Sequence, residues 1–334
     1  MRAAIIGAGG FGTSLAVVLG GKGIDVRLWV REPELCRAIG ELRENRRYLP
    51  GIEIPSSVTP VDDLRRALEG AEMVVAATPS QVARSVFQEA APLIPTGVPI
   101  VTVSKGIEEG TRLLPTEVLE SVLPPPFHPY LAVLSGPSFA REVAAGSPTL
   151  VTVAAHWQRN AVVVQEAFTA PTFRCYTSTD VVGVQLGGAL KNVIAIGSGI
   201  VDGLGFGNNA RAALITRGLA EMARVAVARG ANPITLSGLS GLGDLVLTCT
   251  GELSRNRRVG VELGRGRSLQ EILGELGQVA EGVNTVRSAR ELAHGLGVEV
   301  PITDQVYAII HEGKDPKRAA AELMARALKP EFRY

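Results

Sequence analysis

The sequence predicts an α/β protein: an N-terminal, doubly wound (Rossmann-like), mostly parallel sheet followed by an all-α domain. Three observations support this fold class. The chain opens with a strand, a glycine-rich loop, a helix and a second strand; strand and helix patterns then alternate as far as Tyr176; after Thr177 strand signals almost vanish. We therefore expect a dinucleotide-binding domain over residues 1–178 and a helical substrate and catalytic domain over residues 179–334.

Bulk composition narrows the function. The 334 residues can bury two cores, and a net charge of +1 gives no field that would attract nucleic acid or an anionic membrane. Cys36, Cys175 and Cys249 are far apart and odd in number, which suits a reducing cytoplasm rather than a disulfide framework. The four histidines show no metal-ligand spacing, and the N-terminus shows no signal sequence. We expect a cytoplasmic protein without a metal.

The loop Gly-Ala-Gly-Gly-Phe-Gly at the end of the first apolar strand is a dinucleotide fingerprint, because a helix over Thr13–Gly23 and a strand over Asp25–Val30 follow it. Gly7 makes the tight turn, Gly9 lets the backbone approach the pyrophosphate, and Gly12 lets helix and strand pack closely. The helix N-terminus would face the phosphates. This pattern predicts NAD or NADP as cofactor.

The residue after the second strand bears on the choice between these cofactors. An acid there would bind the ribose 2′-hydroxyl, whereas Arg31 can bind a 2′-phosphate. We expect NADP to be well accepted, and Glu32 leaves NAD open. The alternative is that Arg31 is a solvated surface charge.

The rest of the first half continues the alternation. We expect helices over Pro33–Arg47, Asp62–Leu68, Gln81–Leu93 and Gln158–Phe168, strands over Glu72–Ala77, Pro99–Val103, Tyr130–Leu134, Leu150–Ala154 and Thr172–Tyr176, and a loop over Tyr48–Pro60. Ligands gather at the carboxyl ends of such strands, so Lys105 could reach an anionic substrate and Thr78–Ser80 could line the nicotinamide side. A solvent-facing loop lysine is the alternative for Lys105. In the turn after the strand Tyr130–Leu134, Ser138 could cap a helix and backbone amides could contact ligand.

Lys191 lies near the middle of an apolar stretch, Val181–Val201, which we interpret as a buried helix with Asp180 as its N-cap. The chain has 34 Lys and Arg residues, of which six are Lys. A lysine surrounded by apolar residues is a candidate for proton transfer, since burial lowers the pKa of an ammonium. Alternatively, Lys191 extends to the surface along its stem. A membrane span is disfavoured by the central lysine.

The second half otherwise reads as helices over Ala210–Arg229, Leu245–Cys249, Leu269–Leu276, Val283–Gly295, Asp304–Glu312 and Ala319–Leu328. Asp244 and Thr248, four residues apart, would share one helix face; Asp244 could orient Lys191, accept a substrate hydroxyl or merely cap the helix. Three arginines cluster within residues 254–260, which suits a phosphate but also an ordinary basic turn. The polar insertion Gln278–Gly282 could close over the cofactor.

Six short motifs occur in order along the chain: Gly7–Gly12 with Phe11, Ser104-Lys105-Gly106-Ile107-Glu108, Ser135-Gly136-Pro137-Ser138-Phe139-Ala140, Leu190-Lys191-Asn192-Val193, Gly241-Leu242-Gly243-Asp244 and Ser254-Arg255-Asn256. With these motifs the chain resembles the soluble NAD(P)-dependent glycerol-3-phosphate dehydrogenases of bacteria over essentially its whole length. The second-half motifs are much more specific than the glycine fingerprint.

The resemblance implies interconversion of dihydroxyacetone phosphate and sn-glycerol 3-phosphate, which supplies glycerophospholipid synthesis. It makes Lys191 the proton donor and acceptor. Predicted substrate contacts are Lys105, Gly136, Ser138, Lys191, Asn192, Asp244, Thr248, Ser254, Arg255 and Asn256. Predicted cofactor contacts are Gly7, Gly9, Gly10, Phe11, Gly12, Arg31, Lys105, Ala140, Arg255, Val279 and Glu281.

Two other interpretations stay open at this point. One is another two-domain, lysine-dependent dehydrogenase of the phosphogluconate or ketopantoate type, although the run Ser254-Arg255-Asn256 favours a small phosphorylated substrate. The other is a non-enzymatic NAD(H) sensor that binds a partner. The sequence shows no DNA-binding motif or basic stripe, which disfavours this interpretation. The glycine-rich, apolar second half could also pack against a copy of itself, as a homodimer.

Overall fold

The computed structural model describes residues 1–276, 280–328 and 330–331. Its centre is an eight-stranded sheet in the order β10-β9-β8-β7-β6-β1-β2-β5. The strands are β1 (Arg2–Ile6), β2 (Asp25–Trp29), β5 (Val58–Val61), β6 (Met73–Ala76), β7 (Ile100–Thr102), β8 (Leu131–Ser135), β9 (Thr149–Ala155) and β10 (Phe173–Ser178). Neighbouring strands run parallel, apart from the antiparallel pair β8–β9. The predicted fold class is confirmed.

Helices cover both faces of the sheet because side chains along each strand alternate between them. Ala3 and Ile5 of β1 pack with α1 (Gly10–Gly21) and α7 (Gln158–Phe168). Ala4 and Ile6 pack on the other face with the helices α3 (Leu64–Leu68), α4 (Ala83–Ala90) and α5 (Pro115–Val122). The carboxyl ends of the six mutually parallel strands, β1, β2, β5, β6, β7 and β8, form one edge, where α1 and the short helix α6 (Ala140–Ala144) begin, whereas β9 and β10 run in the opposite direction.

The region after β2 differs from our prediction. The helix α2 (Pro33–Leu42) ends at Arg43, whose φ of 52° is left-handed, and a hairpin follows, made of β3 (Glu44–Asn45) and β4 (Leu49–Glu53). The predicted helix over Pro33–Arg47 is therefore confirmed as far as Leu42 and wrong beyond it, and the predicted loop over Tyr48–Pro60 was wrong where β4 and the start of β5 lie. A strand of two residues is too short to show a period of two in the sequence.

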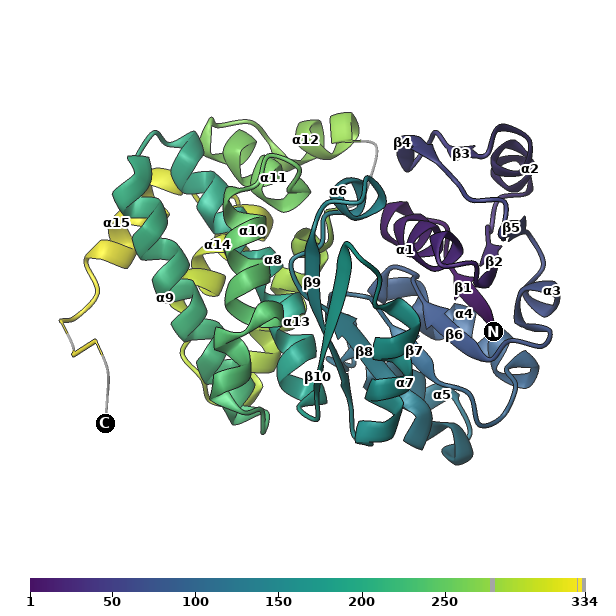
Figure 1. The fold of residues 1–334 in the computed structure, drawn as a ribbon. Coiled ribbons are helices and arrows are strands. Elements are labelled where there is room, and N and C mark those ends of the chain that lie inside the picture. Colours follow the sequence, from purple (N-terminus) through teal and green to yellow (C-terminus); the bar gives the residue numbers. More distant parts are fainter. Residues whose placement is uncertain (277–279, 329, 332–334) are drawn as a thin grey trace.

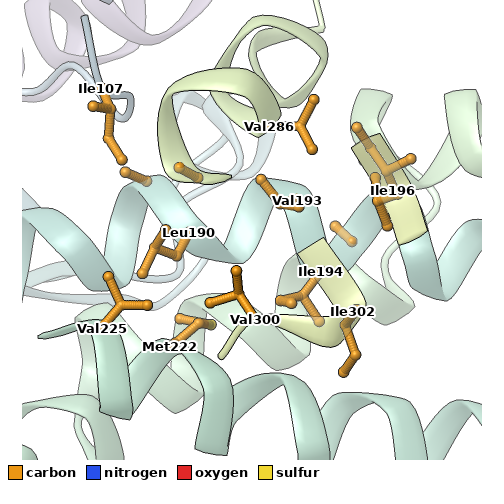
Figure 2. Packing of buried hydrophobic residues seen from close by; sticks show 14 of the residues in the cluster. Ile107, Leu190, Val193, Ile194, Ile196, Met222, Val225, Val286, Val300 and Ile302 are labelled. Atoms are coloured by element: carbon orange, nitrogen blue, oxygen red, sulfur yellow. The ribbon is translucent and has the colours of Figure 1, made fainter. Parts of the chain in front are cut away.

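The second half is a helical bundle around α8 (Val181–Gly203) (Figure 1). The other helices are α9 (Gly207–Ala228), α10 (Asp244–Thr250), α11 (Arg255–Gly264), α12 (Leu269–Leu276), α13 (Glu281–Gly295), α14 (Pro301–His311) and α15 (Pro316–Met324). Figure 2 shows Leu190, Val193 and Ile194 of α8 among apolar side chains of neighbouring elements. By length and composition α8 could cross a membrane, but its apolar window is wholly buried inside the protein.

Glycines let α8 and α11 pack with their backbones in contact. A Cβ at Gly199 would lie 2.0 Å from the Arg257 carbonyl oxygen, and one at Gly260 would lie 2.0 Å from the Ile196 carbonyl oxygen. Gly203 makes a similar approach to the carbonyl oxygen of Val261. This contact holds the start of α11 close to the helix that carries Lys191. Gly199, Gly203 and Gly260 belong to the glycine-rich second half on which our homodimer prediction rested, and they pack against a helix of the same chain.

The loop after β7 joins the two halves. Ile107 and Leu114 follow a strand of the sheet, yet both are fully buried in the core of the helical bundle. Figure 2 shows Ile107 in this core. The sheet ends at Ser178 and α8 begins at Val181, on either side of the boundary that we predicted. Ile107 and Leu114 belong to the first half by sequence but pack in the core of the second half, so the division at residue 178 remains a proposal.

Candidate active site

The Lys191 amine is buried and has two partners. Its Nζ donates to Asp244 Oδ1 at 2.7 Å and to Thr248 Oγ1 at 2.8 Å, and its side chain is 8% exposed. The Thr248 hydroxyl donates to the Asp244 carbonyl oxygen at 2.6 Å, which leaves a lone pair for the ammonium. Burial lowers the pKa of Lys191 to about 8, although the Asp244 charge acts in the opposite direction. An ammonium with such a pKa can exchange protons near neutral pH.

Lys105 brings a second ammonium to the same carboxylate. Its Nζ donates to Asp244 Oδ2 at 2.7 Å and to the Gly136 carbonyl oxygen at 2.8 Å, and lies 5.8 Å from the centroid of the Phe11 ring. Asp244 is 1% exposed. One buried carboxylate thus balances two ammoniums, one from each half of the chain, so a net positive charge remains for an anionic ligand.

The turn after β8 lies beside Lys105. Gly136 has a φ of 152°, and a Cβ there would lie 2.9 Å from Val151 Cα, so glycine is needed. The Ser138 hydroxyl lies 3.5 Å from Lys105 Nζ and donates to the Gly136 carbonyl oxygen at 2.8 Å. Ser138 is not the helix cap that we suggested, because α6 has Phe139 as its N-cap.

Asn192 and Asn256 tie three elements together. Asn192 Nδ2 donates to the Lys105 carbonyl oxygen at 3.3 Å, and Asn192 Oδ1 accepts from Asn256 Nδ2 at 2.9 Å. Asn256 Oδ1 in turn accepts from the Gly282 amide at 3.0 Å. The Asn256 side chain therefore links α11 to α8 and α13; its amide keeps one N–H and one lone pair beyond these bonds, and the substrate contact predicted for it stays a prediction.

The arginine cluster divides into different roles. Ser254 is the N-cap of α11, its Oγ accepting from the Arg257 amide at 3.2 Å, so residues 254–260 form a helix start rather than a basic turn. Arg257 donates to Asp202 Oδ2 through Nε at 2.9 Å, which commits it to an internal ion pair. Arg255 is exposed in the first turn of α11. An arginine at a helix N-terminus suits a phosphate.

Glu281 begins α13 near these cations. Burial of its carboxyl raises its pKa, and the charges of Arg255, Lys191 and Lys105 act against that shift. Val279 and Gln278 lie outside the described residues, so the structure does not place this predicted cofactor contact or most of the insertion that could close over the cofactor.

The glycine loop at the start of α1 fits a dinucleotide. Gly7 has a φ of 122° and a Cβ there would lie 2.7 Å from the Ala77 carbonyl oxygen; a Cβ at Gly12 would lie 2.0 Å from the Gly7 carbonyl oxygen. Gly9 is different: its φ is an ordinary −66°, and nothing lies within 4 Å of the place for its Cβ. The first and third glycines close the turn, and the second leaves open space at the N-terminus of α1.

Gly10, Phe11 and Gly12 form the first turn of α1, which starts three residues earlier than predicted. A Cβ at Gly10 would lie 2.9 Å from the Tyr48 carbonyl oxygen and 3.6 Å from Ala140 Cβ, so this glycine makes room for the hairpin and α6. The sequence analysis missed the hairpin, because its turn over residues 46–48 contains no Gly, Pro, Asn or Asp and the Pro50-Gly51 pair lies inside β4.

Arg31 stands at the end of β2, as predicted, with its side chain 73% exposed and its guanidinium 3.4 Å from Glu32 Oε1. An exposed pair of this kind contributes little, so Arg31 can turn to a ligand phosphate. Among the described residues, no group of three or more His, Cys, Asp or Glu side chains could hold a metal ion.

Comparison with known families gives matches over both halves. A model of the NAD-dependent glycerol-3-phosphate dehydrogenase N-terminus matches residues 2–161, and one of the C-terminus of the same enzyme matches residues 180–321. A glycerol-3-phosphate dehydrogenase [NAD(P)+] from Myxococcus xanthus is 60% identical over 332 residues, 99% of either chain. One of the same name from Geobacter sulfurreducens is 52% identical over 330 residues, 99% of this chain and 98% of that protein.

Solved structures agree with these matches. The glycerol-3-phosphate dehydrogenase of Coxiella burnetii is 42% identical with a TM-score of 0.92, covering 97% of this chain and 99% of that one. A ketopantoate reductase from Ralstonia eutropha is 18% identical, with a TM-score of 0.57, and covers 96% of this chain and 100% of that one. The second likeness shows a shared fold alone.

Proposed function

Since this chain belongs to the NAD-dependent glycerol-3-phosphate dehydrogenase family, we propose that Lys191 is the proton donor and acceptor in its reaction. The protein is an NAD(P)-dependent oxidoreductase that interconverts dihydroxyacetone phosphate and sn-glycerol 3-phosphate. The observation that carries the residue assignment is the shared carboxylate of Asp244, which holds the Lys191 and Lys105 ammoniums at 2.7 Å each.

The chemistry divides between cofactor and chain. The reduced nicotinamide, when bound, supplies a hydride to the carbonyl carbon. Negative charge then grows on the ketone oxygen, where the Lys191 ammonium stabilises it and delivers a proton. In the reverse direction the neutral Lys191 amine takes the hydroxyl proton of glycerol 3-phosphate. Asp244 and Thr248 hold the amine in one orientation, so little rearrangement is needed at the moment of transfer.

The phosphate of the substrate is proposed to lie at the start of α11. Arg255 and the N-terminus of this helix supply positive charge there, and Lys105 adds a second cation from the sheet half. Binding energy from the unreactive phosphate would then fix the position of the ketone against Lys191. Ser138 and the turn at Gly136 would line the same space.

The cofactor preference, cellular location and partners are proposed from the family and from the exposed Arg31. The relatives are named for NAD(P)+, and the exposed Arg31 at the end of β2 supports good acceptance of NADP. We expect a cytoplasmic enzyme that supplies glycerophospholipid synthesis, without nucleic-acid partners or membrane insertion. A homodimer remains a prediction that size measurement in solution would test.

A steady-state substrate panel tests this function. We expect oxidation of NADH and of NADPH with dihydroxyacetone phosphate, followed by nicotinamide absorbance, and no turnover with ketopantoate. Turnover of ketopantoate but not of dihydroxyacetone phosphate would reverse the assignment. Binding of NADH without turnover of any substrate would favour the sensor.

A further inference from the structure

The β3–β4 hairpin is fastened to the glycine loop by one buried amide, Asn45. Its side chain is 0% exposed. Nδ2 donates to the Ala8 carbonyl oxygen at 2.8 Å and to Thr13 Oγ1 at 2.9 Å, while Oδ1 accepts from the Tyr48 amide at 3.2 Å. The Asn45 amide thus joins the loop, the first turn of α1 and the hairpin.

The bond to Ala8 sets the direction of the next amide. A trans peptide is planar, with its C=O and N–H on opposite sides, so a carbonyl held towards Asn45 turns the Gly9 N–H away from the hairpin. Within the described part of the chain, the Gly9 amide donates no hydrogen bond. Open space also surrounds the place of a Cβ on Gly9, at the positive end of α1. A free donor is therefore presented where an anion would be attracted.

The hairpin meets the loop at a second point. The Tyr48 carbonyl oxygen lies 2.9 Å from where a Cβ of Gly10 would be, so the hairpin backbone packs on the first turn of α1. Since the Tyr48 amide is bound by Asn45, loosening Asn45 would disturb both contacts.

We propose that Asn45 is a positioning residue for the cofactor pyrophosphate: it fixes the Ala8–Gly9 peptide so that the Gly9 amide faces the diphosphate. It acts through the loop and does not touch the cofactor. The ligand class is any nucleotide with a diphosphate bridge, such as NADH, NADPH or ADP-ribose. This role rests on the use of NAD(P) by the protein.

The variant Asn45→Asp tests the role. The carboxylate keeps an acceptor for the Tyr48 amide but loses the donor and turns negative charge towards the Ala8 carbonyl oxygen. We expect the Kd of ADP-ribose and of NADH, measured by calorimetry, to rise about 10-fold or more. The Kd of adenosine, which has no phosphate, should stay within about twofold of wild type.

Two controls separate positioning from general loosening of the fold. Asn160→Asp changes another buried asparagine whose Nδ2 donates to a backbone carbonyl, that of Pro129, and should lower the melting temperature without changing the Kd of ADP-ribose. Thr13→Val removes one acceptor of Asn45 and also the bond of 3.3 Å that the Thr13 hydroxyl donates to the Ala8 carbonyl oxygen, but it keeps the shorter bond from Asn45, so it should raise the Kd of ADP-ribose by less than Asn45→Asp does.

Unchanged ADP-ribose affinity in Asn45→Asp would overturn the proposal, as would equal losses for ADP-ribose and adenosine. If that variant does not fold, the test is an NMR titration of the wild-type protein with ADP-ribose. ADP-ribose should then shift the NMR signal of the Gly9 amide proton downfield, and an unmoved signal would contradict the role. Failure of wild type to bind NADH would instead refute the cofactor assignment.

Discussion

The two halves of the molecule differ in the groups that they would present to the reactants in the proposed mechanism. The sheet half presents backbone: a glycine loop, a helix N-terminus and a hairpin that holds both. The helical half presents charged side chains, among them the buried pair Lys191 and Asp244, and Lys105 is the charged group that the sheet half adds to them. Backbone donors suit a cofactor that keeps one shape, whereas a side-chain ammonium can change its charge during each turnover.

The glycines of the two halves show the same contrast. Gly9 has open space in front of it, so its missing side chain makes room for a ligand. Gly199 and Gly260 have another helix in that place, so their missing side chains let α8 and α11 approach. We therefore expect Gly9 to serve ligand binding and Gly199 and Gly260 to serve packing, and substitutions should separate the two roles.

The largest expected effect comes from removing the ammonium of the helical half. Lys191→Ala should lower kcat for dihydroxyacetone phosphate reduction by about 10²- to 10⁴-fold, the usual range for a general acid. The Kd of NADH, measured by fluorescence titration, should not change. A suitable control is Lys22→Ala, since Lys22 Nζ donates to carbonyls at the end of α7. Normal turnover in Lys191→Ala would remove Lys191 from the mechanism.

A smaller effect is expected at the proposed phosphate site of the helical half. Arg255→Ala should raise the KM for dihydroxyacetone phosphate by about 10- to 100-fold, since charge-assisted bonds are worth roughly 1.5–3 kcal/mol. Arg258→Ala, an exposed change on the same helix, should leave KM nearly unchanged. Equal effects of the two changes would count against a specific phosphate contact.

The glycine contrast predicts opposite phenotypes for two alanine substitutions. Gly260→Ala places a Cβ against the Ile196 carbonyl oxygen and should cost about 1–3 kcal/mol of unfolding free energy, measured by denaturant. Gly9→Ala meets nothing within the chain and should leave stability near wild type while weakening NADH binding. Unfolding of the protein by Gly9→Ala, or unchanged stability in Gly260→Ala, would contradict the different roles that we assign to these two glycines.

The sequence predicted the side-chain site better than the backbone site. The sequence alone shows a lone lysine in an apolar helix and an acid four residues before a threonine. The structure brings these residues, Lys191, Asp244 and Thr248, together. The hairpin with Asn45 was missed because β3 has only two residues and β4 contains Pro50 and Gly51, which are uncommon in strands. The Arg257–Asp202 ion pair was missed because it depends on the glycine contact between two helices.

The pH dependence of kcat/KM tests most directly whether Lys191 transfers the proton. With its pKa lowered to about 8, the ammonium needed for ketone reduction is lost as the pH rises. Reduction of dihydroxyacetone phosphate at saturating NADH should therefore fall above pH ~8, by about one log unit per pH unit. Oxidation of glycerol 3-phosphate should rise through the same midpoint. Profiles that stay flat, or that change in the same direction, between pH ~7 and ~9.5 would contradict the role of Lys191.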